Sequence, residues 1–335
     1  MKFSIIGCQH AHIEIFIEEM MKLGHECAGI FEQENMTLAS RLAEKYQIPL
    51  VHDKMLLLDD SIQLVGCAAI NNEKIDVIEL CEKYRKHIMI DKPAVTNRGD
   101  LIRLEAVVNR GAIQVGMLLT ERFRASLSTL KKQLDEGAIG DLISISMRKP
   151  HLLNPKQRPS WHFSKQKSGG IVIDLFIHDF DLLRWLTGKE VKSITGYMAK
   201  NILPEYPSFF DTAGLQVIME DGLAVQLYAD WFTPEKSWTW GDGRIFAVGT
   251  KGTIEIRLEG DPLVAKDVLY LKVTSEQELT AIEEGRIPIT ITEDFLNRVR
   301  GENCLLQHED IIAATEATIR ADECTETIYR FKEKS

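Results

Sequence analysis

A histidine stands between two aspartates at helical spacing near the middle of the chain. Asp174, His178 and Asp181 occur at i, i+4 and i+7, which places them on one face of a helix. Their neighbours are almost all large and apolar, so the helix should be buried and its polar stripe must face a partner or a cavity. An aspartate one turn before a histidine can fix its tautomer and raise its basicity, which indicates a general acid/base site. The alternative is a structural helix in which Asp181 bonds Arg184.

Glycines mark both ends of this helix, and the elements around it follow two patterns. Gly169 and Gly170 open it and Gly188 closes it. Before residue 120, buried strands alternate with helices, which predicts a doubly wound parallel sheet. After Val191, short strands separated by glycine-containing turns predict a mostly antiparallel sheet covered by helices. The segment from about His308 to Phe331 is expected to be one long helix. The predicted domains are residues 1–120 and 121–335.

Ligands of doubly wound sheets bind outside the carboxyl ends of the strands, and the turn after the first strand is one such place. A dinucleotide site typically has Gly-x-Gly-x-x-Gly here, but only Gly7 of that pattern is present. The alternative is an ordinary strand-to-helix turn. His10 and His12 are two residues apart with no third ligand beside them, so no metal site is predicted.

Two further polar signals follow later strands. Glu32, at the end of the second strand, can bond the ribose 2′-hydroxyl of NAD and repel the 2′-phosphate of NADP, or it is simply solvated. Lys92, in Asp91-Lys92-Pro93, follows another strand and is held by a rigid proline. It can hydrogen-bond a substrate oxygen and stabilise negative charge there, or it is a solvated loop lysine.

The composition limits the class of partner and the compartment. The chain has 335 residues, which favours two domains, and a formal net charge of −10, which argues against nucleic acid or an anionic membrane. No run is long enough to span a bilayer, and the N-terminus lacks the features of a signal peptide. The six cysteines form no CxxC pair, so free thiols in a reducing cytoplasm are expected.

Several motifs, in their order and spacing, resemble those of the Gfo/Idh/MocA family of NAD(P)-dependent oxidoreductases, named after glucose–fructose oxidoreductase and inositol dehydrogenase. They cover almost the whole chain. The stretches and the family motifs that they resemble are Lys86 to Pro93 ("GKHVxxEKP", with Asp91 for Glu), Val115 to Phe123 ("VGxxxRF"), Gly137 to Ile143 ("GxIGxI"), Ser168 to Asp181 ("GGGxLxDxGxHxxD") and Gly249 to Thr253 ("GtkGt").

The resemblance implies a Rossmann domain followed by an open mixed sheet that often mediates dimers or tetramers. It implies hydride transfer between a nicotinamide cofactor and a carbinol carbon of a sugar, inositol or related polyol. Glu32 indicates that the cofactor is NAD rather than NADP. Lys92, Asp174 and His178 would form the catalytic group. His178 would take the hydroxyl proton, Asp174 would orient His178 or substrate, and Lys92 would hold the oxygen being oxidised. A homodimer or homotetramer is expected.

The resemblance also assigns binding residues. Those for the cofactor are Gly7, Gln9, His10, His12, Glu32, Ile70, Asn71, Asn72, Asp91 and Lys92. Those for the substrate are Arg122, Trp161, His162, Asp174 and His178. The stretch from His151 to Lys167, which is rich in basic and aromatic groups, either closes over a polar or acidic substrate or is a solvated crossover.

The chain departs from the family pattern in two places. Gln9 and His12 stand where the family usually has glycine, and Ile70-Asn71-Asn72 replaces Thr-Pro-Asn. Bulk in the first turn would weaken cofactor binding. Two alternatives to a dehydrogenase follow: a non-catalytic nucleotide- or sugar-binding sensor of the same fold, and a glycosidase that uses NAD for transient oxidation.

Overall fold

Two compact units make up the protein in this computed structural model, which describes residues 1–264, 268–287 and 289–330. Unit 1 contains Met1–Leu119, Gln166–Gly169 and Ile289–Glu316. Unit 2 contains the described residues of Thr120–Lys165, Gly170–Pro288 and Ala317–Ser335. The sequence predicts a single boundary after residue 120, whereas two later segments return to unit 1.

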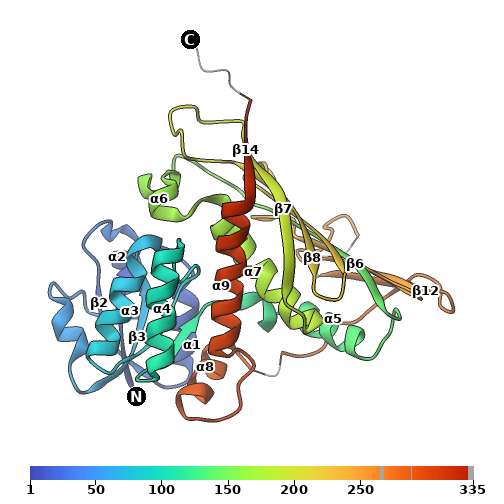
Figure 1. The fold of residues 1–335 in the computed structure, drawn as a ribbon. Helices are drawn as coiled ribbons and strands as arrows, with labels where there is room; N and C mark the ends of the chain where they lie inside the picture. Colours follow the sequence, from blue (N-terminus) through green and yellow to red (C-terminus); the bar gives the residue numbers. More distant parts are fainter. Residues whose placement is uncertain (265–267, 288, 331–335) are drawn as a thin grey trace. The chain divides into compact units, whose positions relative to one another are not determined.

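Unit 1 is built on a parallel sheet with the strand order β2-β1-β3-β4-β5, which confirms the predicted doubly wound fold (Figure 1). The strands are β1 (Lys2–Cys8), β2 (Glu26–Phe31), β3 (Ile62–Ala68), β4 (His87–Ile90) and β5 (Val115–Met117). The helices are α1 (Ile13–Lys22), α2 (Met36–Tyr46), α3 (Lys74–Lys83), α4 (Arg98–Arg110) and α8 (Ile291–Val299), with short 3-10 turns η1 (Lys54–Leu58) and η2 (Asn71–Glu73).

The register of unit 1 brings three strand ends together. Ile6 of β1 pairs with Phe31 of β2, and Cys8 pairs with Ala68 of β3. Every residue of β1 after Lys2 is buried, because the sheet is covered on both faces. The polar residues that follow these strands are therefore held on a rigid edge.

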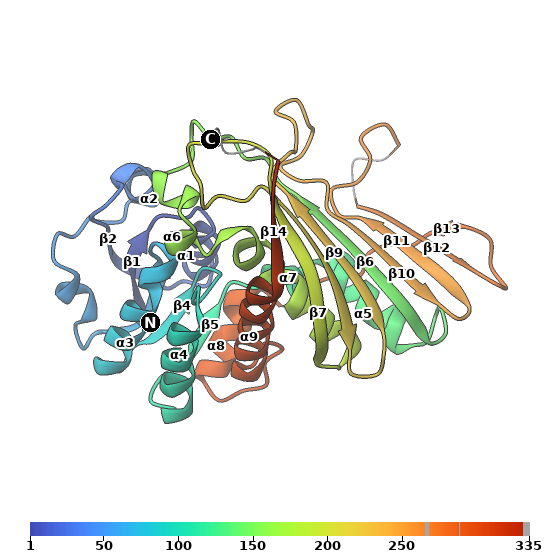
Figure 2. The same ribbon diagram turned by 45° about the horizontal axis from the view of Figure 1, so that its top comes forward.

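Unit 2 contains a nine-stranded sheet that is mostly antiparallel, as predicted (Figure 2). Its spatial order is β13-β12-β11-β10-β6-β9-β8-β7-β14, and only the pairs β6–β9 and β7–β14 are parallel. The strands are β6 (Leu142–Pro150), β7 (Val191–Lys200), β8 (Thr212–Met219), β9 (Ala224–Asp230), β10 (Arg244–Gly249), β11 (Gly252–Arg257), β12 (Leu269–Thr274), β13 (Thr280–Ala281) and β14 (Thr325–Tyr329).

The helices of unit 2 cover one face of this sheet. Helices α5 (Ala125–Asp135) and α7 (Gly170–Thr187) pack their apolar residues into a core with the inward side chains of β6, β8, β9, β10 and β11. The short segments η3 (Thr120–Phe123), η4 (Ser160–Phe163) and α6 (Lys165–Ser168) lie between the longer elements in the chain. None of the helices in the described part of the chain is long and apolar enough to cross a membrane.

Helix α7 is the predicted polar-striped helix, with glycines at both ends. Gly169 and Gly170 have φ of +88° and +80°, and Gly188 has φ of +67°, so each adopts a conformation that other residues avoid. All of the large apolar residues of α7 except Trp185 are buried. The predicted bounds and burial are confirmed.

The predicted long C-terminal helix is wrong beyond residue 324. Helix α9 (His308–Cys324) gives way to β14, which pairs in parallel with β7. The sequence Thr325-Glu-Thr-Ile-Tyr329 is rich in β-branched and aromatic residues, and the edge of β7 offers hydrogen-bond partners that a further helical turn would leave unused. Phe331 lies outside the described residues.

A buried ion pair joins η3 to α7 in unit 2. The Arg122 guanidinium donates from Nε to Asp181 Oδ2 at 2.8 Å and from Nη2 to Oδ1 at 2.6 Å. The two side chains are 2% and 1% exposed, and Arg122 also lies over the Trp185 ring at 5.9 Å. Arg184, the partner suggested for Asp181 in the structural alternative, pairs with Glu190 at 2.6 Å.

Removing one partner of the buried pair should be costly. Asp181→Leu leaves the Arg122 charge buried, so we expect it to lower the free energy of unfolding in urea by about 3–5 kcal/mol. The double variant Arg122→Met, Asp181→Leu should recover most of that loss. Glu190→Gln, which breaks the exposed pair, is the control and should cost less than about 1 kcal/mol. Equal costs for Asp181→Leu and Glu190→Gln would contradict a role for this pair in the core.

Candidate functional site

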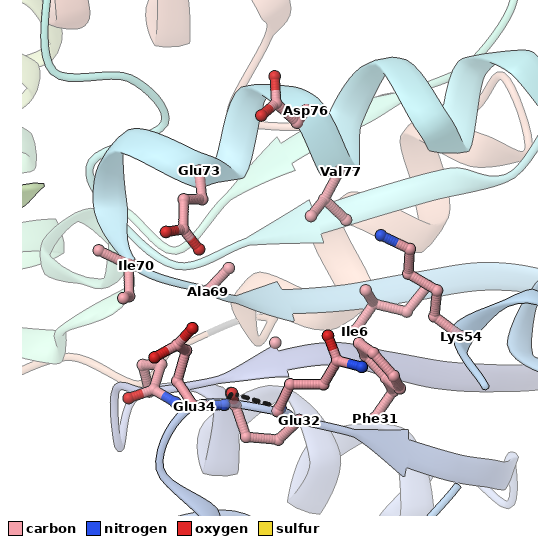
Figure 3. Close-up of a pocket in the computed structure, with 13 residues that line it drawn as sticks. Ile6, Phe31, Glu32, Glu34, Lys54, Ala69, Ile70, Glu73, Asp76 and Val77 are labelled. Atoms are coloured by element: carbon pink, nitrogen blue, oxygen red, sulfur yellow. Dashed lines mark hydrogen bonds between the residues drawn. The ribbon is translucent and has the colours of Figure 1, made fainter. Parts of the chain in front are cut away.

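A pocket of about 230 Å³ lies where β1, β2 and β3 end in unit 1 (Figure 3). It is the place where a doubly wound sheet is expected to bind a ligand. Of the predicted cofactor residues, Gly7, Gln9, Glu32 and Ile70 line it. The remaining lining residues are Ile6, Phe31, Gln33, Glu34, Lys54, Ala69, Glu73, Asp76 and Val77.

The Glu32 carboxylate ties the end of β2 to the first turn. Its Oε2 accepts the backbone N–H of Cys8 at 2.6 Å, and its Oε1 accepts the N–H groups of Gln33 and Glu34, each at 2.8 Å. Three backbone donors hold the side chain in one position, half-buried at the pocket wall. Glu32 is therefore a positioned acceptor and not a solvated surface residue.

The turn after β1 requires its one glycine. Gly7 has φ of +86°, and a Cβ there would lie 2.6 Å from the Cβ of Ala69. Gln9 occupies the position of the second glycine of the dinucleotide pattern. Its side-chain Nε2 is buried and, within the residues that the structure describes, has no hydrogen-bond partner. A residue that lines the pocket thus carries an unsatisfied donor, which fits a dinucleotide.

The pocket wall is strongly acidic. Figure 3 shows Glu73 pointing into the pocket, while Asp76 points away from it. Burial and the neighbouring carboxylate of Glu34 raise the pKa of Glu73. Lys54 is the one basic residue among those that line the pocket. This wall disfavours a ligand that brings additional negative charge to it.

Asp91 brings the two histidines of the first turn together. Its side chain is fully buried, and its Oδ2 and Oδ1 lie 3.0 Å from His10 Nδ1 and 3.1 Å from His12 Nδ1. Burial alone would raise the pKa of Asp91, but the charges of His10 and Lys74 and the histidine contacts hold it well below its usual range. The third ligand-type group that the local sequence lacks therefore comes from the residue after β4, and these three residues are close enough to hold a metal ion. The ammonium of Lys74, 3.7 Å from Asp91 Oδ2, already supplies positive charge and opposes a divalent ion.

Lys74 is a site residue that sequence reasoning missed. Its Nζ is fully buried and donates to Asn71 Oδ1 at 2.8 Å and to the carbonyls of Asp91, Lys92 and Pro93 at 2.8, 3.2 and 3.2 Å. Lys74 therefore fixes the backbone of residues 91–93, which includes Lys92. A lysine in the first turn of a helix gives no signal of this role in the sequence.

The Ile70-Asn71-Asn72 segment has divided roles. Ile70 lines the pocket. Asn71 is held by Lys74 and donates to the Ser168 carbonyl at 2.9 Å, so it is structural. Asn72 Oδ1 is buried and has no hydrogen-bond partner among the described residues. Lys92 is buried, with 6% of its surface exposed.

Unit 2 contains the remaining predicted site residues. His178 is 7% exposed on α7, and Asp174 stands one turn before it. Burial raises the pKa of the adjacent Asp179 to about 6, against the effect of Lys149 at 3.2 Å. The predicted catalytic group is thus divided, with Lys92 in unit 1 and Asp174 and His178 in unit 2.

The predicted substrate residues of unit 2 lie in two surroundings. Trp161 and His162 are buried in a group of aromatic rings, with the His162 ring 5.1 Å from that of Trp231. Trp231 therefore lies beside a candidate site residue. Arg122 is bound to Asp181 in the core of the unit.

Loss of the Lys74 ammonium should loosen the strand end that carries Lys92. Lys74→Met leaves the Asp91 charge buried and three carbonyls without their donor, so we expect about 3 kcal/mol lower stability to urea. Backbone amides near Lys92 should exchange hydrogen faster. Lys86→Met is the matched control, because Lys86 is also buried but donates to one carbonyl, that of Asp59. Equal exchange near Lys92 in both variants would contradict the role given to Lys74.

Comparison with known proteins adds three curated relatives. A myo-inositol 2-dehydrogenase of Thermotoga maritima is 28% identical over 42% of this chain and 40% of its own length. A D-xylose dehydrogenase of Paenarthrobacter nicotinovorans is 25% identical over 52% and 45%. A scyllo-inositol 2-dehydrogenase (NAD(+)) of Bacillus subtilis is 27% identical over 76% and 68%. The chain thus spans less than half the length of the first two relatives.

Solved structures share the whole fold. A protein of Erwinia carotovora atroseptica has a TM-score of 0.87 and 26% identity, covering 98% of this chain and 99% of that one. An aldose-aldose oxidoreductase from Caulobacter crescentus has a TM-score of 0.77 and 17% identity, covering 96% and 97%, which shows the fold alone. The family profile of the GFO/IDH/MocA C-terminal domain matches residues 127–255. With this domain in unit 2, the parallel sheet of unit 1 and these relatives, the chain belongs to the Gfo/Idh/MocA family.

Proposed function

We propose that the protein is an NAD-dependent oxidoreductase that acts on a hydroxyl-bearing carbon of a sugar, inositol or related polyol. The observation that carries this proposal is the pocket at the ends of β1, β2 and β3, which is lined by a positioned Glu32 and by Gln9, whose amide donor is unsatisfied. The names of the relatives, inositol and xylose dehydrogenases, support the substrate class.

The chain's own residues would hold the cofactor as follows. Gly7 admits the close approach of the backbone, and Gln9 donates to a phosphate or ribose oxygen. Glu32 has lone pairs left on its oxygens to accept from a ribose hydroxyl. When bound, the nicotinamide supplies the acceptor or donor of hydride.

NAD is favoured over NADP by the charge of the wall. Glu32, Glu34 and Glu73 all line the pocket. The 2′-phosphate of NADP would bring further negative charge to them, and like charges brought together cost several kcal/mol. The pKa of Glu73 is already raised by this crowding and by burial.

The catalytic roles rest on α7 and on the turn after β4. We assign His178 as the base that takes the hydroxyl proton and Asp174, one turn before it, as the group that orients His178 or the substrate. Lys92 would donate a hydrogen bond to the oxygen and stabilise negative charge on it. Lys92 belongs to unit 1, and Asp174 and His178 belong to unit 2.

A non-catalytic sensor is the second candidate, and the start of α1 favours it. The N–H groups of Ile13, Glu14 and Ile15 already donate to the carbonyls of residues 10–12, so the first turn of α1 offers fewer free donors to a pyrophosphate. A protein that binds nucleotide weakly and turns nothing over would match this feature.

We propose a second copy of this chain as the partner of unit 2, in a homodimer or homotetramer. The face of the sheet opposite α5 and α7 exposes apolar side chains and has a groove lined by residues of β6, β7, β8, β9 and β10. The exposed apolar residues on these strands are Ile143, Tyr197, Phe246 and Val248. Such a surface is typical of an interface.

Cofactor choice should follow the acidic wall. We expect NADH to bind at least tenfold more tightly than NADPH, measured by titration with tryptophan quenching and nicotinamide fluorescence. Glu34→Gln should improve NADPH binding about fivefold by removing one like charge. Asp76→Gln is the control, because Asp76 points away from the pocket and pairs with Arg103. Binding of neither nucleotide would favour the sensor.

Turnover should depend on the assigned catalytic groups. With NAD and a panel of inositols, pentoses and hexoses, we expect His178→Ala and Lys92→Ala to lower kcat about 100-fold or more while NADH binding changes little. His52→Ala, at an exposed position, is the control. Full turnover by either site variant would refute these roles. Nucleotide binding without turnover of any sugar by the unmodified protein would favour the sensor.

A further inference from the structure

Arg158 of unit 2 contacts two tryptophan rings. It belongs to the loop between β6 and α7, and its guanidinium carbon lies 5.2 Å from the centre of the Trp231 ring and 5.3 Å from that of Trp240. Both distances are within the range of cation–π attraction. Two cation–π contacts thus restrain the guanidinium.

Backbone carbonyls fix the guanidinium further but use only one edge of it. Nε donates to the Leu153 carbonyl at 3.0 Å, and Nη2 donates to the Leu152 carbonyl at 3.4 Å. Among the described residues, Nη1 has no hydrogen-bond acceptor. A guanidinium has five N–H groups in a rigid fork, so the end formed by Nη1 and Nη2 still offers two roughly parallel donors.

Arg158 also lacks a counter-ion among the described residues, since no carboxylate lies within ion-pair distance of it. Burial lowers the pKa of Arg158, and the charge of Asp174 offsets this only in part. Five other arginines of unit 2 are paired with carboxylates, namely Arg122, Arg124, Arg184, Arg244 and Arg257. Arg148 lies over the Tyr228 ring and Arg320 donates to the Val191 carbonyl. Arg158 is therefore a rigid, half-buried cation with a free pair of donors.

The neighbours of Arg158 connect it to the candidate substrate residues. His162 stacks edge-on against Trp231, the same ring that Arg158 contacts, and Trp161 lies next to His162. The Trp161 indole Nε1 is buried and has no partner among the described residues.

We propose that Arg158 binds a carboxylate of the substrate, so that the protein acts on an acidic sugar or polyol rather than on a neutral one. The planar end of the guanidinium matches the two oxygens of a carboxylate, and the two carbonyls and the indoles hold the group without neutralising its charge. The proposal rests on the proposed function and adds the chemical class of its substrate.

Binding calorimetry of the whole protein tests this directly, without and with NADH. The ligands are matched pairs of neutral sugar and acid: glucose with glucuronate, galactose with galacturonate, and mannose with mannuronate. We expect at least one acid to bind ten times more tightly than its neutral partner. Arg158→Gln should abolish that preference and leave binding of the neutral sugar unchanged, whereas Arg158→Lys should retain part of it. Arg184→Gln, which removes a paired arginine on α7, is the control.

Each other outcome overturns the proposal. Equal binding of acid and neutral sugar, no binding of any acid, or equal weakening of both ligands by Arg158→Gln would leave Arg158 with a packing role only. Tighter binding of glucose 6-phosphate than of every carboxylate would assign the site to phosphate. If Arg158→Gln fails to fold, Arg158→Lys still decides, because it keeps the charge and removes the planar fork. If neutral polyols reduce NAD and acids bind no more tightly than neutral sugars, only the inference about Arg158 is refuted. If an acid binds but NADH does not, only the proposed function is refuted.

Discussion

A fully buried carboxylate at the end of β4 determines how unit 1 is arranged around its functional edge. Asp91 is surrounded by protein and needs positive or hydrogen-donating partners that also lie inside. Lys74 comes from α3, and His10 and His12 come from the turn before α1, so three separate parts of the chain meet at one charge. The turn at the nucleotide pocket and the backbone of Lys92 are thereby fixed by the same group of contacts.

Two arginines of unit 2, Arg122 and Arg158, differ in whether a carboxylate balances their charge. Arg122 is fully paired with Asp181 and stabilises the contact of η3 with α7. Arg158 is held by rings and carbonyls, which orient it but leave its charge uncompensated. The first arrangement is complete without a ligand, and the second gains stability when an anion arrives. Arg122 is therefore a structural residue of the core, whereas Arg158 is the proposed ligand-binding residue.

The sequence predicts well what depends on local pattern and poorly what depends on distant partners. The alternation of strands and helices in unit 1, the limits of α7 and the antiparallel strands of unit 2 follow from periodicity and glycines, and the structure has them. The meeting of Asp91 with His10 and His12 joins residues about 80 positions apart, which no local pattern reveals. Lys74 and Arg158 likewise resemble ordinary charged residues in the sequence. The end of α9 at Cys324 depends on the free edge of β7, which is also a tertiary feature.

The three backbone hydrogen bonds to Glu32 couple cofactor choice to folding. An engineer who wished to convert the protein to NADP would replace this acidic residue first, yet the same replacement removes the acceptor that holds Cys8, Gln33 and Glu34 in place. Glu34 and Glu73 are charged residues of the same pocket wall, but the backbone N–H of Cys8 is bound by Glu32. If the proposed preference for NAD holds, substitution of Glu34 or Glu73 should therefore change it with less damage to the fold than substitution of Glu32.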